Sequence, residues 1–207
     1  MGTCLIISGG DFSPIPDNIH YDYVIACDHG YDHARSLKIK PDLIVGDFDS
    51  CDTQRGDIDD IPIREFPAQK DDSDTMLAIR YALSADYKHV IICCALGGRL
   101  DHTLANIQSM AFVASHGGEC ELVSTSEYLR TFTGGVLHLP RKDGYSLSVY
   151  ALSDKCTNVS IYGSAYDIKE ATITNNFPLG LSNYWKNESV TITMSDGILL
   201  IVESLCI

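Results

Sequence analysis

The feature of this sequence that most restricts its fold is a change of hydrophobic period near residue 130. Before that point, short continuous apolar runs alternate with segments of helical period. Apolar strands that alternate with helices are typical of a mainly parallel, Rossmann-like sheet covered on both faces. The apolar runs are CLIIS, YVIAC, DLIV and VIICCAL, and the helical segments are YDHARSL, DTMLAIRYAL and TLANIQSMAFVASHGG. The pattern predicts an α/β domain over residues 1–128.

The last helical segment has limits that are visible in the sequence. We expect it to run from Thr103 and to end at Gly117-Gly118, a pair typical of a helix C-cap. Its apolar stripe consists of Leu104, Ile107, Ala111 and Ala114.

After residue 130 the hydrophobic period shifts toward two, which is typical of strands. The strand-like segments are YSLSVYAL, NVSIYG, ATITNN and VTITMSDGILLIV, and Asp196-Gly197 predicts a hairpin turn within the last of them. A helix-free segment of this kind predicts an antiparallel β-sandwich over residues 129–207. Because a domain this small has little core of its own, we expect it to pack on the first domain or on a second subunit.

Charge restricts the possible partners. The chain has 28 acidic and 15 basic residues, a formal net charge of −13. A sequence-independent nucleic-acid binder needs a cationic surface to displace counterions, so we expect no nucleic-acid partner. An anionic small molecule remains possible where a divalent cation and local basic groups offset the charge.

Cysteine use and hydropathy indicate a cytoplasmic protein. Four of the eight cysteines, Cys4, Cys27, Cys93 and Cys94, lie inside apolar runs, where free thiols behave as small buried hydrophobes. No apolar run reaches the roughly 20 residues that cross a bilayer, and no basic leader precedes the first apolar run. We therefore expect no membrane association and no signal peptide.

Glycine and aspartate follow each of the four apolar runs. In an open α/β sheet, ligands bind beyond the carboxyl ends of the strands, so these residues are candidates for one site. The four segments are Gly9-Gly10-Asp11, Asp28-His29-Gly30, Gly46-Asp47-Phe48-Asp49-Ser50 and Gly97-Gly98-Arg99-Leu100-Asp101-His102.

The segment GDFDS is a candidate magnesium site. In extended backbone, Asp47 and Asp49 point to the same face while Phe48 points to the other. Carboxylate oxygens of this kind suit Mg²⁺, which takes its remaining ligands from water and phosphate. An Asx turn with a solvated carboxylate is the alternative for an isolated pair.

The segment KDDSDT is a second acidic cluster, at the expected start of a helix. Asp71 and Asp74 are three residues apart and can face the same way, and Lys70 can offset phosphate charge. Either Asp72 or Ser73 can cap the helix that runs on from Asp74. The helix dipole alone also favours acidic residues in a first turn, which is the alternative explanation.

The segment GGRLDH combines groups that can bind phosphate. Two glycines let backbone approach a ligand, the helix that follows offers N–H groups, and Arg99 supplies a planar guanidinium. Asp101 and His102 can instead serve only as caps. No GxGxxG fingerprint and no P-loop motif is present, so a classical dehydrogenase and a Walker-type kinase are excluded.

Taken together and in this order, DLIVGDFDS, KDDSDT, LGGRLDH and the distant GLSN resemble the thiamin pyrophosphokinase family. The resemblance implies transfer of the pyrophosphoryl group of ATP to the hydroxyl of thiamin, giving thiamin diphosphate and AMP, with Mg²⁺. It also implies an N-terminal α/β domain that binds ATP and Mg²⁺, a C-terminal β-sandwich that binds thiamin, and a homodimer with active sites between subunits.

The resemblance also assigns roles by position. It implies that the metal ligands are Asp47, Asp49, Asp71 and Asp74. The catalytic residues that it implies are Asp49, Asp71, Asp74, Arg99 and Asp101. For ATP it implies Asp28, Gly30, Asp47, Lys70, Gly98, Arg99 and His102. For thiamin it implies Asp101, Ser182, Asn183 and Trp185. His29 and Tyr184-Trp185 depart from the family's usual residues.

The sequence leaves open two alternative functions and the identity of the general base. Acidic clusters on an α/β sheet also suit a Mg²⁺-dependent nucleotide or phosphoester hydrolase. A non-catalytic thiamin or nucleotide sensor would keep the binding residues without turnover. Either Asp71 or Asp101 can accept the proton of the attacking hydroxyl.

Overall fold

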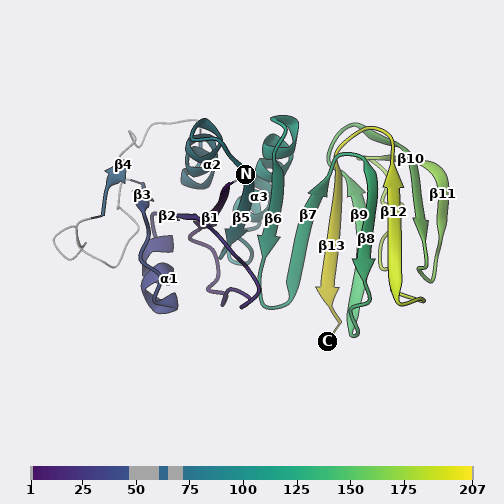
Figure 1. Cartoon of the computed structure of the whole chain (residues 1–207), viewed down its shortest axis with the longest axis horizontal. Helices are drawn as coiled ribbons and strands as arrows, with labels where there is room; N and C mark the ends of the chain where they lie inside the picture. The colour runs from purple at the N-terminus through teal and green to yellow at the C-terminus, as the bar shows by residue number, and fades with distance from the viewer. Residues whose placement is uncertain (1, 47–60, 65–71, 207) are drawn as a thin grey trace. The chain divides into compact units, whose positions relative to one another are not determined.

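The computed structural model describes residues 2–46, 61–64 and 72–206 (Figure 1). The backbone divides into two compact units, Met1–Thr125 and Ser126–Ile207. This division lies close to the boundary predicted after residue 128.

The first unit contains a parallel sheet with the strand order β4-β3-β2-β1-β5-β6. The strands are β1 (Gly2–Ile7), β2 (Tyr23–Cys27), β3 (Leu43–Val45), β4 (Ile63–Arg64), β5 (Tyr87–Cys93) and β6 (Glu119–Val123). The helices are α1 (Gly30–Leu37), α2 (Asp74–Ser84) and α3 (Leu100–Ser115). The predicted alternation of parallel strands and helices is confirmed. The strands β4 and β6 were not among the strands predicted from the sequence.

Burial along β1 shows why its sequence is continuously apolar. Cys4, Leu5, Ile6 and Ile7 are all 0% exposed. Successive side chains of a strand point to opposite faces, so both faces of the sheet are covered here. An alternating apolar and polar pattern would instead have placed one face in water.

The order of the strands opens a crevice between β1 and β5. From β1 the chain builds outward through β2, β3 and β4, and then returns to place β5 on the other side of β1. The connections that leave the carboxyl ends of β1 and β5 therefore run in opposite directions. Such a topological switch point is where open α/β sheets bind ligands.

The start of α2 agrees with the sequence. Of the two possible caps, Ser73 is the N-cap, and its hydroxyl accepts a hydrogen bond from the backbone N–H of Met76 at 3.3 Å. Asp72 instead accepts a hydrogen bond from Nε of Arg80 at 2.8 Å.

The predicted limits and stripe of α3 need correction, although its end is as expected. The helix begins at Leu100 rather than Thr103, and Leu104 is 54% exposed. The buried face consists of Asn106, Ser109, Met110, Val113 and Ala114. This buried face includes polar and small side chains, so a search for an apolar stripe does not identify it. At the other end Gly117 has a φ of 74°, the left-handed conformation typical of a helix end.

The second unit contains only antiparallel strand pairs, in the orders β7-β13-β9 and β11-β10-β12-β8. The strands are β7 (Glu127–Phe132), β8 (Gly135–Pro140), β9 (Tyr145–Ala151), β10 (Lys155–Tyr162), β11 (Ile168–Thr174), β12 (Ser189–Met194) and β13 (Leu199–Leu205). One buried apolar cluster draws on both sets of strands, with Val149 and Ile201 from the first and Ile161 and Ile192 from the second. The predicted antiparallel arrangement is confirmed.

The predicted hairpin at Asp196-Gly197 is wrong. β12 pairs with β10 and β8, whereas β13 pairs with β7 and β9, so the two strands belong to different sets. The N–H of Thr157 donates to the carbonyl of Asp196 at 2.9 Å, which extends the contact with the β10 segment. A period of two predicts a strand but does not identify its partner.

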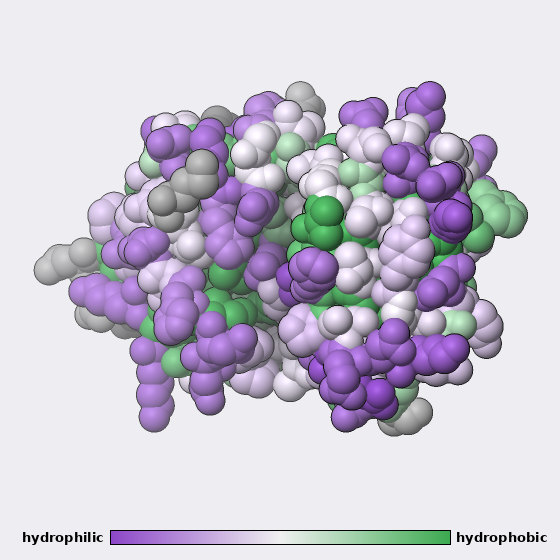
Figure 2. Space-filling view, turned by 45° about the vertical axis from the view of Figure 1, so that its right-hand side comes forward, coloured by the Kyte–Doolittle hydropathy of each residue, from purple (hydrophilic) through white to green (hydrophobic). Residues whose placement is uncertain are grey.

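Polar side chains dominate the visible surface, with small apolar areas among them (Figure 2). Within the described ranges, no helix has the length and apolar character needed to cross a bilayer.

Candidate active site

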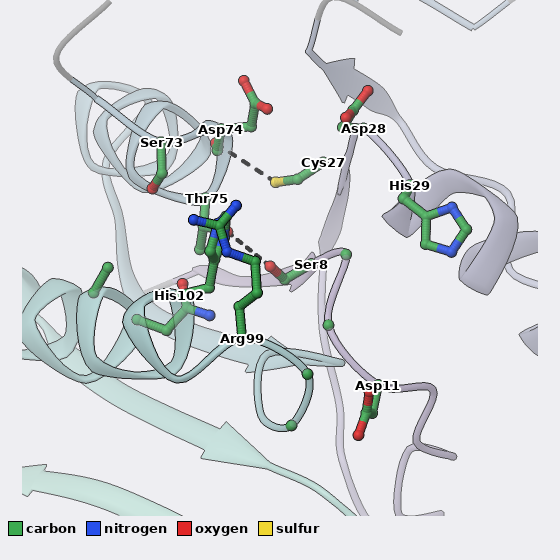
Figure 3. A pocket seen from close by; sticks show the side chains of 16 residues that line it. Ser8, Asp11, Cys27, Asp28, His29, Ser73, Asp74, Thr75, Arg99 and His102 are labelled. Carbon is green, nitrogen blue, oxygen red and sulfur yellow. Dashed lines mark hydrogen bonds between the residues drawn. The ribbon is translucent and has the colours of Figure 1, made fainter. Parts of the chain in front are cut away.

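A cavity of about 530 Å³ lies in the first unit, beyond the carboxyl ends of β1, β2 and β5 (Figure 3). Its walls are the loop after β1, the end of β2, the start of α2 and the GGRLDH segment. Cavities of this volume suit small-molecule ligands. The switch point in the strand order therefore coincides with a space that can hold a ligand.

The floor of the cavity is held by hydrogen bonds that continue past the ends of β1 and β5. The N–H of Ser8 donates to the carbonyl of Cys93 at 3.0 Å, and the N–H of Gly10 donates to Cys94 at 2.7 Å. The N–H of Asp11 then donates to the carbonyl of Leu96 at 3.0 Å. The two loops are thus joined along their length, which fixes the position of the groups that they carry.

Gly97 is a position where only glycine fits. Its φ is +79°, and a Cβ there would lie 2.0 Å from a carboxylate oxygen of Asp11. A side chain would be strained by the backbone and would displace Asp11 as well. The first glycine of the GGRLDH motif is therefore explained by the close approach of two loops.

Three helix N-termini converge on the cavity. His29, Ser73 and Arg99 are the N-caps of α1, α2 and α3, and all three line it. A helix N-terminus carries partial positive charge and favours anions. The three helix N-termini therefore offer anion-binding N–H groups to the cavity, although the whole chain is strongly acidic.

Asp28 and Asp74 bring two carboxylates to the same edge of the cavity (Figure 3). Asp28 has a φ of 46°, which is uncommon for a residue with a side chain. A Cβ on Gly46 would lie 3.1 Å from the Cβ of Asp28, so the end of β3 lies against it. The thiol of Cys27 donates to the carbonyl of Asp74 at 3.6 Å, which joins the end of β2 to the start of α2.

The predicted metal ligands are only partly described. Asp47, Asp49 and Asp71 lie outside the described residues, as does Lys70, and Asp74 is the one predicted ligand within them. Among the described residues, no group of three or more histidine, cysteine, aspartate or glutamate side chains is arranged to hold a metal ion.

Arg99 and Asp101 form an exposed ion pair at the start of α3. Nε of Arg99 donates to Oδ1 of Asp101 at 3.1 Å, and the side chains are 73% and 61% exposed. The hydrogen bond from Arg99 lowers the pKa of Asp101, and the N–H of His102 acts in the same direction. A carboxylate whose pKa is lowered is a weaker proton acceptor. Arg99 lines the cavity.

The structure brings five of the predicted site residues to one cavity, which are Asp28, Asp74, Gly98, Arg99 and His102. Gly30 instead has a clear packing role, because a Cβ there would lie 2.1 Å from the carbonyl oxygen of Ile7. The absence of a side chain at Gly30 lets α1 pack closely against β1.

Several cavity residues were not predicted from the sequence. The hydroxyls of Ser8 and Thr75 lie 2.7 Å apart in a hydrogen bond between β1 and α2. Nδ2 of Asn106 donates to the carbonyl of Ala95 at 2.8 Å. Asp11 also lines the cavity, as expected for the Gly9-Gly10-Asp11 segment that follows the first apolar run, although the resemblance assigned it no role. Asn106, in the middle of a helix, carries no comparable signal in the sequence.

The predicted thiamin residues other than Asp101 lie in the second unit, and two of them are committed to the protein interior. Asn183 is 4% exposed, and its amide contacts the backbone of Tyr166 and Tyr184 and the hydroxyl of Ser164. Trp185 is 5% exposed, and its indole N–H donates to the carbonyl of Leu139 at 3.1 Å. Ser182 is exposed, with a φ of 57°. Their contacts with thiamin stay predictions.

Comparison with known proteins identifies the family. Residues 18–122, which include most of the cavity, match the family model described as thiamin pyrophosphokinase, catalytic domain. The chain belongs to the thiamin pyrophosphokinase family. The match covers half of the chain and contains the GDFDS, KDDSDT and GGRLDH segments.

Relatives of this family member resemble the chain over its full length. Thiamine pyrophosphokinase of Bacillus subtilis is 27% identical, with 99% of each sequence covered. The crystal structure of thiamine pyrophosphokinase from B. subtilis has a TM-score of 0.88 at 25% identity and covers 99% of this chain and 100% of that one. A thiamin pyrophosphokinase family protein from Enterococcus faecalis has a TM-score of 0.82 at 25% identity, with 99% of each chain covered. Thiamin pyrophosphokinase from Candida albicans, 18% identical over 98% of this chain and 89% of that one, shares the fold with a TM-score of 0.78.

Proposed function

We propose that this protein transfers the pyrophosphoryl group of ATP to the hydroxyl of thiamin, producing thiamin diphosphate and AMP. The observation that carries the proposal is the cavity at the β1–β5 switch point, where three helix N-termini and Arg99 converge within the segment that matches the family's catalytic domain. The helix N-termini and Arg99 support binding of a polyphosphate, and a divalent cation would offset the carboxylates of the same cavity.

The same proposal assigns a role to each domain. The first, residues 1–128, is a Rossmann-like domain that binds ATP and Mg²⁺, and the second, residues 129–207, is a β-sandwich that binds thiamin through Ser182, Asn183 and Trp185, with Asp101. We further propose a cytoplasmic homodimer with active sites between subunits. Support comes from the family and from exposed apolar side chains of the second unit, namely Tyr166, Phe177, Leu181 and Tyr184.

The donor set of the proposed metal site fits Mg²⁺. All four proposed ligands, Asp47, Asp49, Asp71 and Asp74, are carboxylates, and Mg²⁺ prefers oxygen ligands. Asp28 and Asp74 show that carboxylates gather at this edge of the cavity. When bound, the ion would neutralise charge on the polyphosphate.

The protein contributes chiefly by positioning the reactants. The thiamin hydroxyl attacks the β-phosphorus, the bond to the α-phosphate oxygen breaks, and AMP leaves with that oxygen. The Arg99 guanidinium offsets charge that develops on the transferred group. We propose that Asp71 or Asp101 accepts the hydroxyl proton, and the pairing with Arg99 that lowers the pKa of Asp101 makes Asp101 a weaker base.

Identification of both products after incubation with ATP, Mg²⁺ and thiamin tests the proposal. Release of AMP that depends on thiamin, together with thiamin diphosphate, is the expected result. Nucleotide hydrolysis without thiamin would support the phosphoester hydrolase instead. Tight binding of thiamin or ATP without turnover would support a sensor.

Substitution of the proposed ligands tests the site itself. Asp49→Asn and Asp71→Asn should each lower turnover by orders of magnitude and leave the fold intact, because Asn has nearly the shape of Asp and only the charge is lost. Asp17→Asn, at an exposed residue that is not among the cavity residues, is the matched control. Near-wild-type turnover in Asp49→Asn or Asp71→Asn would contradict the metal assignment.

A further inference from the structure

Asp11 is a carboxylate of the cavity for which the proposed chemistry has no use. It lies in the loop after β1, and its backbone N–H donates to the carbonyl of Leu96 at 3.0 Å. Its carboxylate lies over the Gly97-Gly98 turn, close enough that a Cβ on Gly97 would clash with it at 2.0 Å. The side chain therefore lies in the wall of the cavity, against the Gly97-Gly98 turn.

The carboxylate of Asp11 is available to a ligand. Among contacts within the described ranges, it takes part in no hydrogen bond and no ion pair. An ionised carboxylate only accepts hydrogen bonds, so it repels phosphate and attracts groups that carry O–H or N–H donors. A residue of this kind is unsuited to the phosphates of a nucleotide and well suited to its sugar hydroxyls.

The position of Asp11 separates it from the other acidic residues of the cavity. Figure 3 shows Asp28 and Asp74 at one edge and Asp11 at the opposite edge. Phosphates that occupy the region of the helix N-termini, with a cation at the Asp28 and Asp74 edge, leave the opposite edge for the nucleoside. Carboxylates recognise ribose hydroxyls in this way in other nucleotide-binding α/β folds.

We propose that Asp11 accepts hydrogen bonds from the ribose hydroxyls and makes the site selective for ribonucleotides over deoxyribonucleotides. The inference rests on the proposed function only in taking a nucleoside triphosphate as the ligand of the cavity. It adds a residue that determines which triphosphate is used.

Nucleotide binding measured by calorimetry in Mg²⁺ tests this proposal directly, with ATP, 2′-deoxy-ATP and 3′-deoxy-ATP as probes. The wild-type protein should bind ATP about 10- to 100-fold more tightly than at least one deoxynucleotide, as expected for a hydrogen bond to a charged group. Asp11→Ala should lose this preference, and Asp11→Asn, which keeps one acceptor oxygen, should retain part of it. Asp17→Ala, on the same connection between β1 and β2, should bind as the wild type does.

The ratio of affinities separates recognition from structural damage. A variant whose loop is merely disturbed would bind all three nucleotides more weakly by the same factor and keep the wild-type ratio. That result, or equal binding of ATP and both deoxynucleotides by the wild type, would overturn the proposal. Weaker binding of thiamin alone in Asp11→Ala would also overturn it, because the carboxylate would then recognise the cationic substrate.

The binding assay tests the role of Asp11, and the product assay tests the transferase, so each proposal can be refuted without the other. Ribose-selective binding without formation of thiamin diphosphate would retain the role of Asp11 and refute the transferase. Formation of thiamin diphosphate with equal kcat/KM for ATP and both deoxynucleotides would retain the transferase and refute the role of Asp11. No binding of any nucleotide would refute both.

Discussion

Replacement of Asn183 by alanine should destabilise the second unit, because every polar atom of this amide has a partner within the protein. Nδ2 donates to the hydroxyl of Ser164 at 3.0 Å and to the carbonyl of Tyr166 at 2.8 Å. Oδ1 accepts hydrogen bonds from the N–H groups of Tyr166 and Tyr184, both at 3.0 Å. The side chain thus joins the loop that contains Ser164 and Tyr166 to its own segment.

The size of the effect follows from these four contacts. Tyr166 and Tyr184 are exposed residues, so water can replace part of what their backbone groups lose, whereas Ser164 is 2% exposed. At about 0.5 to 1 kcal/mol for each hydrogen bond, the loss in free energy of unfolding is about 2 to 4 kcal/mol. With a urea m-value of about 1.5 kcal/mol/M, a loss of about 3 kcal/mol lowers the midpoint by about 2 M.

The single tryptophan makes the measurement specific to the second unit. Trp185 is buried in the core of that unit, so urea titration of its fluorescence follows unfolding there. Asn175→Ala is the control, because Asn175 is exposed and, among described contacts, its side chain makes no hydrogen bond. An Asn183→Ala midpoint within error of the control would refute the structural role.

Three further predictions concern the first unit. Replacing Arg99 by glutamine should raise the pKa of Asp101 toward its ordinary value, since the hydrogen bond from Arg99 is the main cause of its lowering, and carboxyl NMR titration measures this. Gly30→Ala should lower the melting temperature strongly or prevent folding, because its Cβ would lie 2.1 Å from the carbonyl oxygen of Ile7. Gly117→Ala, which meets nothing within 4 Å but has a φ of +74°, should cost only about 1 kcal/mol. Removal of divalent cations with a chelator should abolish formation of thiamin diphosphate and added Mg²⁺ should restore it, whereas full activity in chelator would contradict the proposed metal.

The parallel strands were predictable because burial on both faces leaves a direct record in the sequence. Runs such as CLIIS and VIICCAL are apolar at consecutive positions, as expected for strands of a sheet covered on both faces. The cap at Ser73 and the left-handed Gly117 were predictable for a similar reason, since local backbone chemistry selects these residue types. The buried face of α3 was not predictable, because it includes Asn106 and Ser109, whose burial depends on contacts with other elements.

The candidate site, too, was predictable from the sequence only in part. Its glycines and aspartates could be found in sequence because each follows a strand, and the family could be identified from their order. Strand pairing decided that Asp28, Asp74, Arg99 and Asp11 share one cavity. It also decided that β12 and β13 pair with different strands. Which strands become neighbours depends on contacts between distant segments, and a local pattern of apolar and polar residues carries no record of them. The sequence alone thus determined the elements and the chemistry at their ends, whereas the tertiary structure decided which ends meet.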